Sequence, residues 1–151
     1  MTTIDAPFPS PAWFVELVSR ATADPTVLER LGIADLRFGM EILTPEGTAH
    51  LYGLVLDGYD ICVVGPTSET SLAADVIVSG PVEAWKDMID WIEEHGPADA
   101  AHSLNGMTIA GVPLEARSDD AMGSDKFYRF MGTLQAIFDA AGVPVASRTA
   151  G

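Results

Sequence analysis

Three histidines and one cysteine are the residues of this chain best suited to bind a metal or to act as nucleophiles. His50, His95 and His102 form none of the spacings H-x-H, H-x-x-x-H or H-E-x-x-H, which place two ligands on one face of a strand or helix. Cys62 lies in an apolar, strand-like segment, which favours a buried and inert thiol. We therefore predict neither a metal site nor a cysteine nucleophile.

Acid–base chemistry could be carried by two carboxylates and one histidine. Asp75 stands between Ala74 and Val76, so an inward-pointing side chain would place an acid or base in an apolar setting. Unpaired carboxylates are rarely buried, and a side chain on the solvent face of a strand is therefore the preferred interpretation. In an enzymatic alternative, Asp75, His50 or Asp60 would supply the acid–base chemistry.

The sequence lacks the glycine-rich loops that hold nucleotide phosphates. Its segment Gly65-Pro66-Thr67-Ser68 has no P-loop lysine, and neither a G-x-G-x-x-G motif nor a G-x-S-x-G elbow occurs. We expect no bound cofactor.

Acidic residues outnumber basic ones by 22 to 8, which gives a net charge of −14. Such a charge opposes binding to nucleic acids and to anionic membranes. It favours solubility, and it would also attract a basic partner protein; a homodimer is a further alternative that the sequence does not decide. No apolar run approaches the roughly 20 residues of a membrane span, and the N-terminus lacks the features of a secretory signal. We expect a cytoplasmic protein without stable membrane insertion.

The elements that must position these residues are strands in the first half of the chain. Apolar residues alternate with Arg37, Gly39 and Glu41 in the first strand, and Asp57-Gly58 is a strong hairpin signal. The five predicted strands are Leu36–Ile42, Thr48–Leu56, Tyr59–Val64, Leu72–Ser79 and Met107–Ala116.

Helices are predicted before and after these strands. Ser10 and Pro11 are suited to begin a first helix that runs to about Ala23, and Asp24-Pro25 begins a short second helix that ends at Gly32. The later predictions are a helix from Val82 to Gly96, a helical turn within residues 98–104 and a helix from Ser124 to Ala141. The prediction is one α+β domain, residues 10–143, with a mainly antiparallel sheet and helices on one face, between a flexible arm (1–9) and a frayed tail (144–151).

Aromatic and methionine side chains gather on the later predicted helices. Trp85 and Trp91 are six residues apart and so lie on different helix faces, and methionine adapts well to irregular apolar ligands. From the residues alone a solid core is favoured over a cavity, because 48% apolar residues is an ordinary composition. The residues that would line a cavity are Trp85, Met88, Ile89, Trp91, Leu104, Met107, Phe127, Phe130, Met131, Leu134 and Phe138.

Three consecutive segments resemble the sterol carrier protein 2 family. They are the strand Ala74–Gly80, the helix from Val82 and the segment Gly106–Gly111 (GMTIAG), which is similar to a G-x-x-x-x-G strand of that family. The likeness extends in element order over about residues 25–140. It implies a five-stranded sheet with helices on one face and an apolar tunnel for sterols, fatty acids or acyl-CoA. The family strand usually carries lysines, whereas GMTIAG has none, which argues against contact with CoA or phosphate.

Three hypotheses about function follow. The first is a protein that binds a hydrophobic small molecule, such as a sterol, steroid or fatty acid, for carriage or for presentation to an enzyme. The second is a small isomerase, hydratase or cyclase that acts on a steroid- or polyketide-like substrate. The third is an acidic interaction module that recruits a basic protein.

Overall fold

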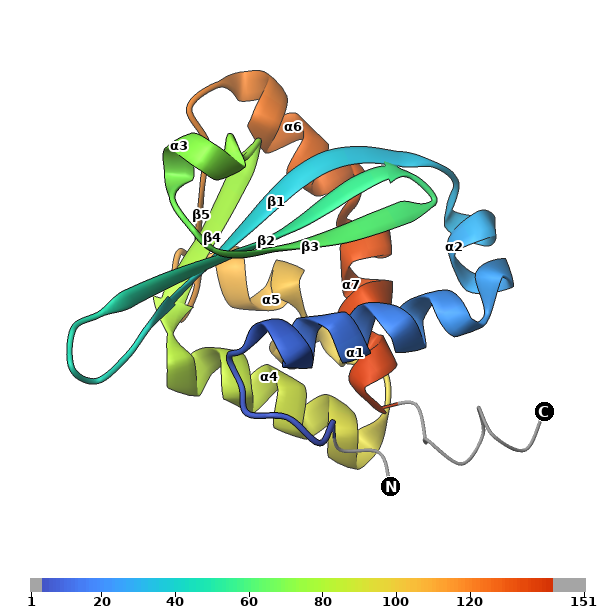
Figure 1. Cartoon of the computed structure of the whole chain (residues 1–151), viewed down its shortest axis with the longest axis horizontal. Coiled ribbons are helices and arrows are strands. Elements are labelled where there is room, and N and C mark those ends of the chain that lie inside the picture. The colour runs from blue at the N-terminus through green and yellow to red at the C-terminus, as the bar shows by residue number, and fades with distance from the viewer. Residues whose placement is uncertain (1–3, 143–151) are drawn as a thin grey trace.

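The computed structural model describes residues 4–142, in which a five-stranded sheet carries most of the helices on one face (Figure 1). The elements are α1 (Pro11–Ala23), α2 (Pro25–Leu31), β1 (Ala34–Leu43), β2 (Ala49–Gly58), β3 (Asp60–Thr67), α3 (Glu69–Leu72), β4 (Val76–Pro81), α4 (Val82–His95), η1 (Ala100–His102), α5 (Leu104–Thr108), β5 (Glu115–Arg117), α6 (Ala121–Arg129), α7 (Met131–Asp139) and η2 (Ala140–Gly142). No helix among these residues is long and apolar enough to cross a membrane.

The sheet has the strand order β3-β2-β1-β4-β5. Three of its pairings are antiparallel, and β1 with β4 is parallel. The expected α+β class and the mainly antiparallel sheet are therefore confirmed, with one parallel pair at the centre. The parallel pair arises because the chain crosses over through β2, β3 and α3 before it returns beside β1.

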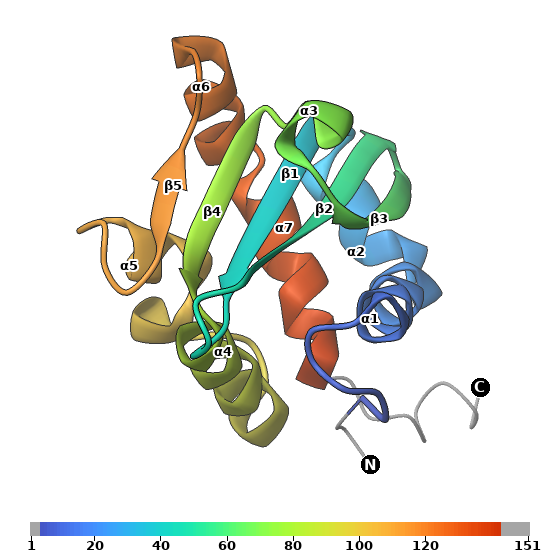
Figure 2. The same ribbon diagram turned by 60° about the vertical axis from the view of Figure 1, so that its left-hand side comes forward.

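One face of the sheet forms the main core, as the alternation in β1 predicts. Leu36, Phe38, Met40 and Ile42 are fully buried there, because successive side chains of a strand point to opposite faces. Helices α1, α4 and α7 cover this face (Figure 2). A smaller cluster of Leu51, Leu72 and Ile77 packs on the opposite face.

The first two helices begin and end at the predicted residues. The Ser10 hydroxyl oxygen accepts a hydrogen bond from the Trp13 backbone N–H at 3.2 Å, and Pro11 is the first helical residue. The Asp24 carboxylate accepts from the Thr26 N–H at 3.1 Å, and Gly32 follows α2 with a φ of 89°. These local signals fix the ends of α1 and α2.

The strand predicted at Met107–Ala116 is largely wrong, because α5 and a turn occupy most of it and only β5 is extended. The two glycines of GMTIAG have other roles. A Cβ on Gly106 would lie 1.7 Å from the Ala100 carbonyl oxygen, so Gly106 lets α5 pack tightly on η1. Gly111 has a φ of 78°, which suits the turn between α5 and β5.

The fourth predicted strand starts too early. Leu72 ends the short helix α3, and β4 begins at Val76. The last predicted helix is two helices, which meet at Phe130, and its cap is Asp120 rather than Ser124. The Asp120 carboxylate accepts from the Gly123 N–H at 2.7 Å, which starts the helix earlier than predicted.

Cys62 is exposed rather than buried as predicted. It lies on β3, which is an edge strand, and pairs with Val55, whose side chain packs with the small cluster rather than the main core. An apolar neighbourhood in the sequence therefore does not bury this thiol.

The described part of the expected N-terminal arm packs on the core. Ile4 is buried, and its N–H donates to a Glu93 carboxylate oxygen at 3.3 Å. Phe8 packs edge-on against Trp13 with ring centroids 4.8 Å apart. The expected frayed tail, 144–151, lies outside the described residues.

Candidate functional site

The residues expected to line a cavity converge on the main core between the helices and the sheet. Eight of them are buried: Trp85, Met88, Ile89, Leu104, Met107, Phe127, Leu134 and Phe138. The other three, Trp91, Phe130 and Met131, are partly buried and pack against the same cluster. The structure thus brings all eleven into one apolar cluster.

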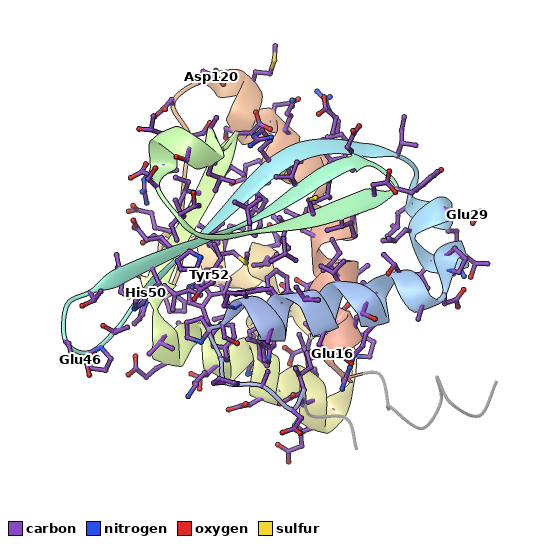
Figure 3. All side chains as sticks on the ribbon, in the orientation of Figure 1. Glu16, Glu29, Glu46, His50, Tyr52 and Asp120 are labelled. Carbon is purple, nitrogen blue, oxygen red and sulfur yellow. The ribbon has the colours of Figure 1, made fainter. Side chains whose placement is uncertain are left out.

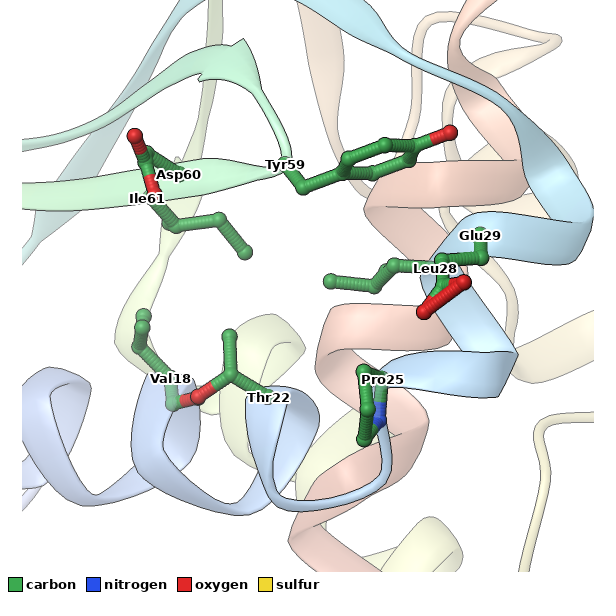
Figure 4. Close-up of a pocket in the computed structure, with 8 residues that line it drawn as sticks. All are labelled: Val18, Thr22, Pro25, Leu28, Glu29, Tyr59, Asp60 and Ile61. Atoms are coloured by element: carbon green, nitrogen blue, oxygen red, sulfur yellow. The ribbon is translucent and has the colours of Figure 1, made fainter.

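A pocket of about 430 Å³ lies where α1 and α2 meet the start of β3 (Figure 4). Its lining residues are Val18, Thr22, Pro25, Leu28, Glu29, Tyr59, Asp60 and Ile61. Val18 and Ile61 also pack against the main core, and Leu28 is buried. The pocket therefore lies beside the main core, at the edge of the layer between the helices and the sheet.

The chemical character of this pocket is apolar on its walls and acidic at its rim. Leu28, Val18 and Ile61 supply aliphatic walls, whereas Glu29 and Asp60 are exposed carboxylates. The Thr22 hydroxyl donates to the Val18 carbonyl oxygen at 2.8 Å and is thus already engaged as a donor. Among residues 4–142, no lysine, arginine or histidine lines the pocket, so these residues offer no cation there to a phosphate or a carboxylate.

Asp60 is the one lining residue that was also a site candidate from the sequence. The others lie on α1, on α2 and at the turn and start of β3. The hairpin signal at Asp57-Gly58 was the one local clue, because it places Tyr59 and Asp60 at the end of the sheet that α2 approaches.

The three acid–base candidates do not meet in one site. Asp60 pairs with Asp57 of β2. His50 lies seven residues before Asp57 on the same strand, so His50 and Asp57 are about 23 Å apart. Figure 3 likewise shows His50 at the opposite end of the sheet from Glu29 of the pocket. Asp75 directly precedes β4. Two strands lie between β4 and β3, so the axes of β4 and β3 are about 14 Å apart.

Asp75 has a structural role in this arrangement. Its carboxylate accepts a hydrogen bond from the Arg37 backbone N–H at 2.8 Å and lies 3.7 Å from the Lys126 ammonium group. The side chain is 26% exposed, so it is neither fully in solvent nor an unpaired buried charge. These contacts tie the start of β4 to β1 and to α6.

The histidines do not form a metal centre. No group of three or more metal-ligating side chains occurs within residues 4–142. His95 and His102 instead stack on Trp91, with ring centroids 4.5 Å and 4.9 Å apart. His102 also lies within 2.6 Å of the Asp99 carboxylate, which caps η1.

Comparison with known proteins identifies the architecture. No protein-family model matches the sequence, and no curated protein matches it at a significant level. A solution structure from Thermus thermophilus, of a conserved hypothetical protein described as a candidate sterol carrier protein, aligns with a TM-score of 0.58. It is 12% identical, and the alignment covers 93% of this chain and 90% of that protein. The chain has a sterol carrier protein 2-like fold.

A second match supports the same sterol carrier protein 2-like fold. The apo form of sterol carrier protein 2 from Yarrowia lipolytica aligns with a TM-score of 0.50 at 14% identity, over 83% of this chain and 99% of that protein. The expected sheet, with helices on one face, is thereby confirmed. At these identities the likeness establishes the fold, and the occupant of the core layer is a separate question.

Proposed function

We propose that this protein binds a hydrophobic small molecule, such as a sterol, steroid or fatty acid, and carries it or presents it to an enzyme. The observation that carries the proposal is the pocket between α1, α2 and β3, which lies at the edge of the apolar layer. Its volume of about 430 Å³ falls in the usual range for small-molecule sites. The sterol carrier names of two proteins with this fold support the same class of ligand.

In this proposal the pocket is the entrance and the eleven core residues are the deeper wall. A ligand would enter beside Val18 and Ile61, whose side chains already join the pocket to the core. Met88 and Met107 are flexible and polarizable, so they can repack around an irregular apolar body. Binding would be driven by burial of apolar surface, at about 25 cal/mol per Å² before the entropic costs of association. No covalent step is required.

A matched pair of substitutions on one helix tests the entrance. Val18→Trp fills the pocket, whereas Val15→Trp adds the same side chain at a position of α1 that is 56% exposed. We expect Val18→Trp to weaken binding of a fluorescent fatty acid or sterol by about tenfold or more, which is about 1.4 kcal/mol, and Val15→Trp to leave it unchanged.

The measurement is a fluorescence titration, preceded by native mass spectrometry of the purified protein to detect bound lipid. Absence of co-purified lipid together with no binding of either probe to the wild type would overturn the proposal. Equal weakening by both variants would show that the pocket is not the entrance.

A further inference from the structure

Trp85 is the one described residue with a fully buried side-chain nitrogen or oxygen that lacks a hydrogen-bond partner. It lies on α4, is completely inaccessible to solvent, and its ring centroid is 6.2 Å from that of Phe138 on α7. The unpartnered atom is the indole Nε1, whose N–H is a donor only. The donor therefore lies within the apolar cluster that the proposed ligand would contact.

An unpaired N–H in a core is costly. Leaving a buried donor unsatisfied destabilises a protein by about 1–3 kcal/mol, and nearly all buried polar groups in folded proteins are paired. Phenylalanine would fill much of the same space without a polar atom. A tryptophan at this position therefore points to an acceptor that residues 4–142 do not supply.

The charge of that acceptor follows from its surroundings. The buried polar or charged side chains among residues 4–142 are Arg20, Thr108 and Thr133. Arg20 already donates to the Ala141 carbonyl oxygen and pairs with Glu16, and Thr108 donates to the Leu104 carbonyl oxygen. An anionic group next to Trp85 would thus be buried without a dedicated cation, which is far more costly than burying a neutral oxygen.

We propose that the bound molecule carries a neutral oxygen, a hydroxyl or a ketone, that accepts a hydrogen bond from Trp85 Nε1. This inference rests on the proposed function and narrows its ligand class. The polar end of the ligand is the buried end, and Trp85 determines specificity by favouring an oxygenated apolar molecule over a hydrocarbon of the same shape. Fatty-acid anions are disfavoured at this position.

Matched probes test the specificity. Dodecan-1-ol is compared with dodecane and dodecanoate, and cholesterol with 5-cholestene, all delivered from cyclodextrin to the wild type and to Trp85→Phe. We expect the wild type to bind at least one alcohol about 5–150-fold more tightly than its hydrocarbon, and Trp85→Phe to lose that preference. Dodecanoate should bind more weakly than dodecan-1-ol. Trp13→Phe, a buried tryptophan on α1, is the matched control and should keep the preference.

The outcomes separate the two proposals. If the wild type binds each alcohol and its hydrocarbon equally, the role of Trp85 is overturned and the ligand-binding function stands. If no probe binds the wild type and no lipid co-purifies, the proposed function itself fails, and the inference fails with it.

A second measurement does not depend on how well Trp85→Phe folds. The indole N–H resonance of Trp85 in the ¹⁵N-labelled wild type should lie upfield without ligand. It should move downfield when the preferred alcohol binds, and not when its hydrocarbon binds. A resonance already at a hydrogen-bonded position, and unchanged by the alcohol, would show that the Trp85 N–H already has a partner without ligand and would overturn the inference.

Discussion

Asp139, at the end of α7, is a carboxylate whose surroundings oppose its charge. Burial raises the pKa of this carboxyl above its ordinary value, and hydrogen bonds from the Ala98 N–H and the Gln135 amide partly offset the effect. The folded state therefore holds the proton more strongly than the unfolded state. The contribution of Asp139 to the free energy of unfolding is fully present when the pH is below 3.8, the ordinary pKa of this carboxyl. It is lost as the pH rises through the higher pKa of the folded state.

The substitution Asp139→Asn tests the direction of this pKa shift. The amide keeps an oxygen to accept the hydrogen bonds from Ala98 and Gln135 but carries no charge. We expect the Asp139→Asn variant to unfold at a higher temperature than the wild type at pH 7. At pH 3 the difference between the two unfolding temperatures should be smaller. Glu94→Gln, at an exposed position of α4, is the control and should show little dependence. A larger gain in unfolding temperature at pH 3 than at pH 7 would contradict a raised pKa at Asp139.

At the scale of elements, α6 and α7 differ in how closely they approach their neighbours. A Cβ on Gly123 of α6 would lie 2.1 Å from the Asp75 carbonyl oxygen, whereas a Cβ on Gly132 of α7 would meet only the Leu31 side chain at 3.5 Å. The contact at Gly123 involves backbone, which cannot move aside as a flexible side chain can. Gly123 thus allows α6 to pack on the residues just before β4.

Alanine substitutions at these two glycines should have opposite effects. We expect Gly123→Ala to destabilise the protein by about 1–3 kcal/mol through overpacking. Gly132→Ala should stabilise it by up to about 1 kcal/mol, because alanine favours the helix and its Cβ makes an ordinary contact. Urea unfolding measures both. A neutral Gly123→Ala would mean that α6 can shift away from β4 without cost.

The predictable elements are those with strong local signals. The Ser10 cap defines α1, the alternation of Leu36–Ile42 defines β1, and the amphipathic period after Val82 defines α4. Residues 107–114 were wrongly predicted as strand because α5 is too short to show a helical period. The position of β5 depends on its pairing with β4 rather than on its own pattern. The break at Phe130 was hidden by an apolar stripe that continues through both helices.

The candidate site was predictable only in part. The side chains of the main core follow from helical periodicity, so their convergence could be anticipated. The pocket depends on how α2 lies against the β2–β3 hairpin, which no local pattern reports. The missing acceptor at Trp85 likewise requires knowing every neighbour of one buried atom.

At the scale of the whole molecule, the net charge of −14 affects the stability of the folded chain. Like charges on one small chain repel one another, and salt screens that repulsion. We expect the unfolding temperature to rise between 0.02 and 0.5 M NaCl by about 2–4 °C, the shift that about 1 kcal/mol produces in a chain of this size. Calorimetry measures it, and an unchanged or lower temperature would show that attractive ion pairs dominate.

The same salt series separates two uses of the protein. Binding of a neutral lipid probe should change little with ionic strength, because its driving force is apolar burial. Capture of a basic partner protein, the interaction hypothesis from the sequence, should weaken markedly.

The exposed position of Cys62 gives this chain a natural attachment point for a reporter. It is the single cysteine of the sequence, so a thiol-reactive dye would label one known place without any engineered residue. It neighbours Ile61 of the pocket along β3, yet alternation directs the two side chains to opposite faces of the strand. A dye there would sit next to the pocket without occupying it, and its emission could report in real time whether a hydrophobic probe binds as we propose.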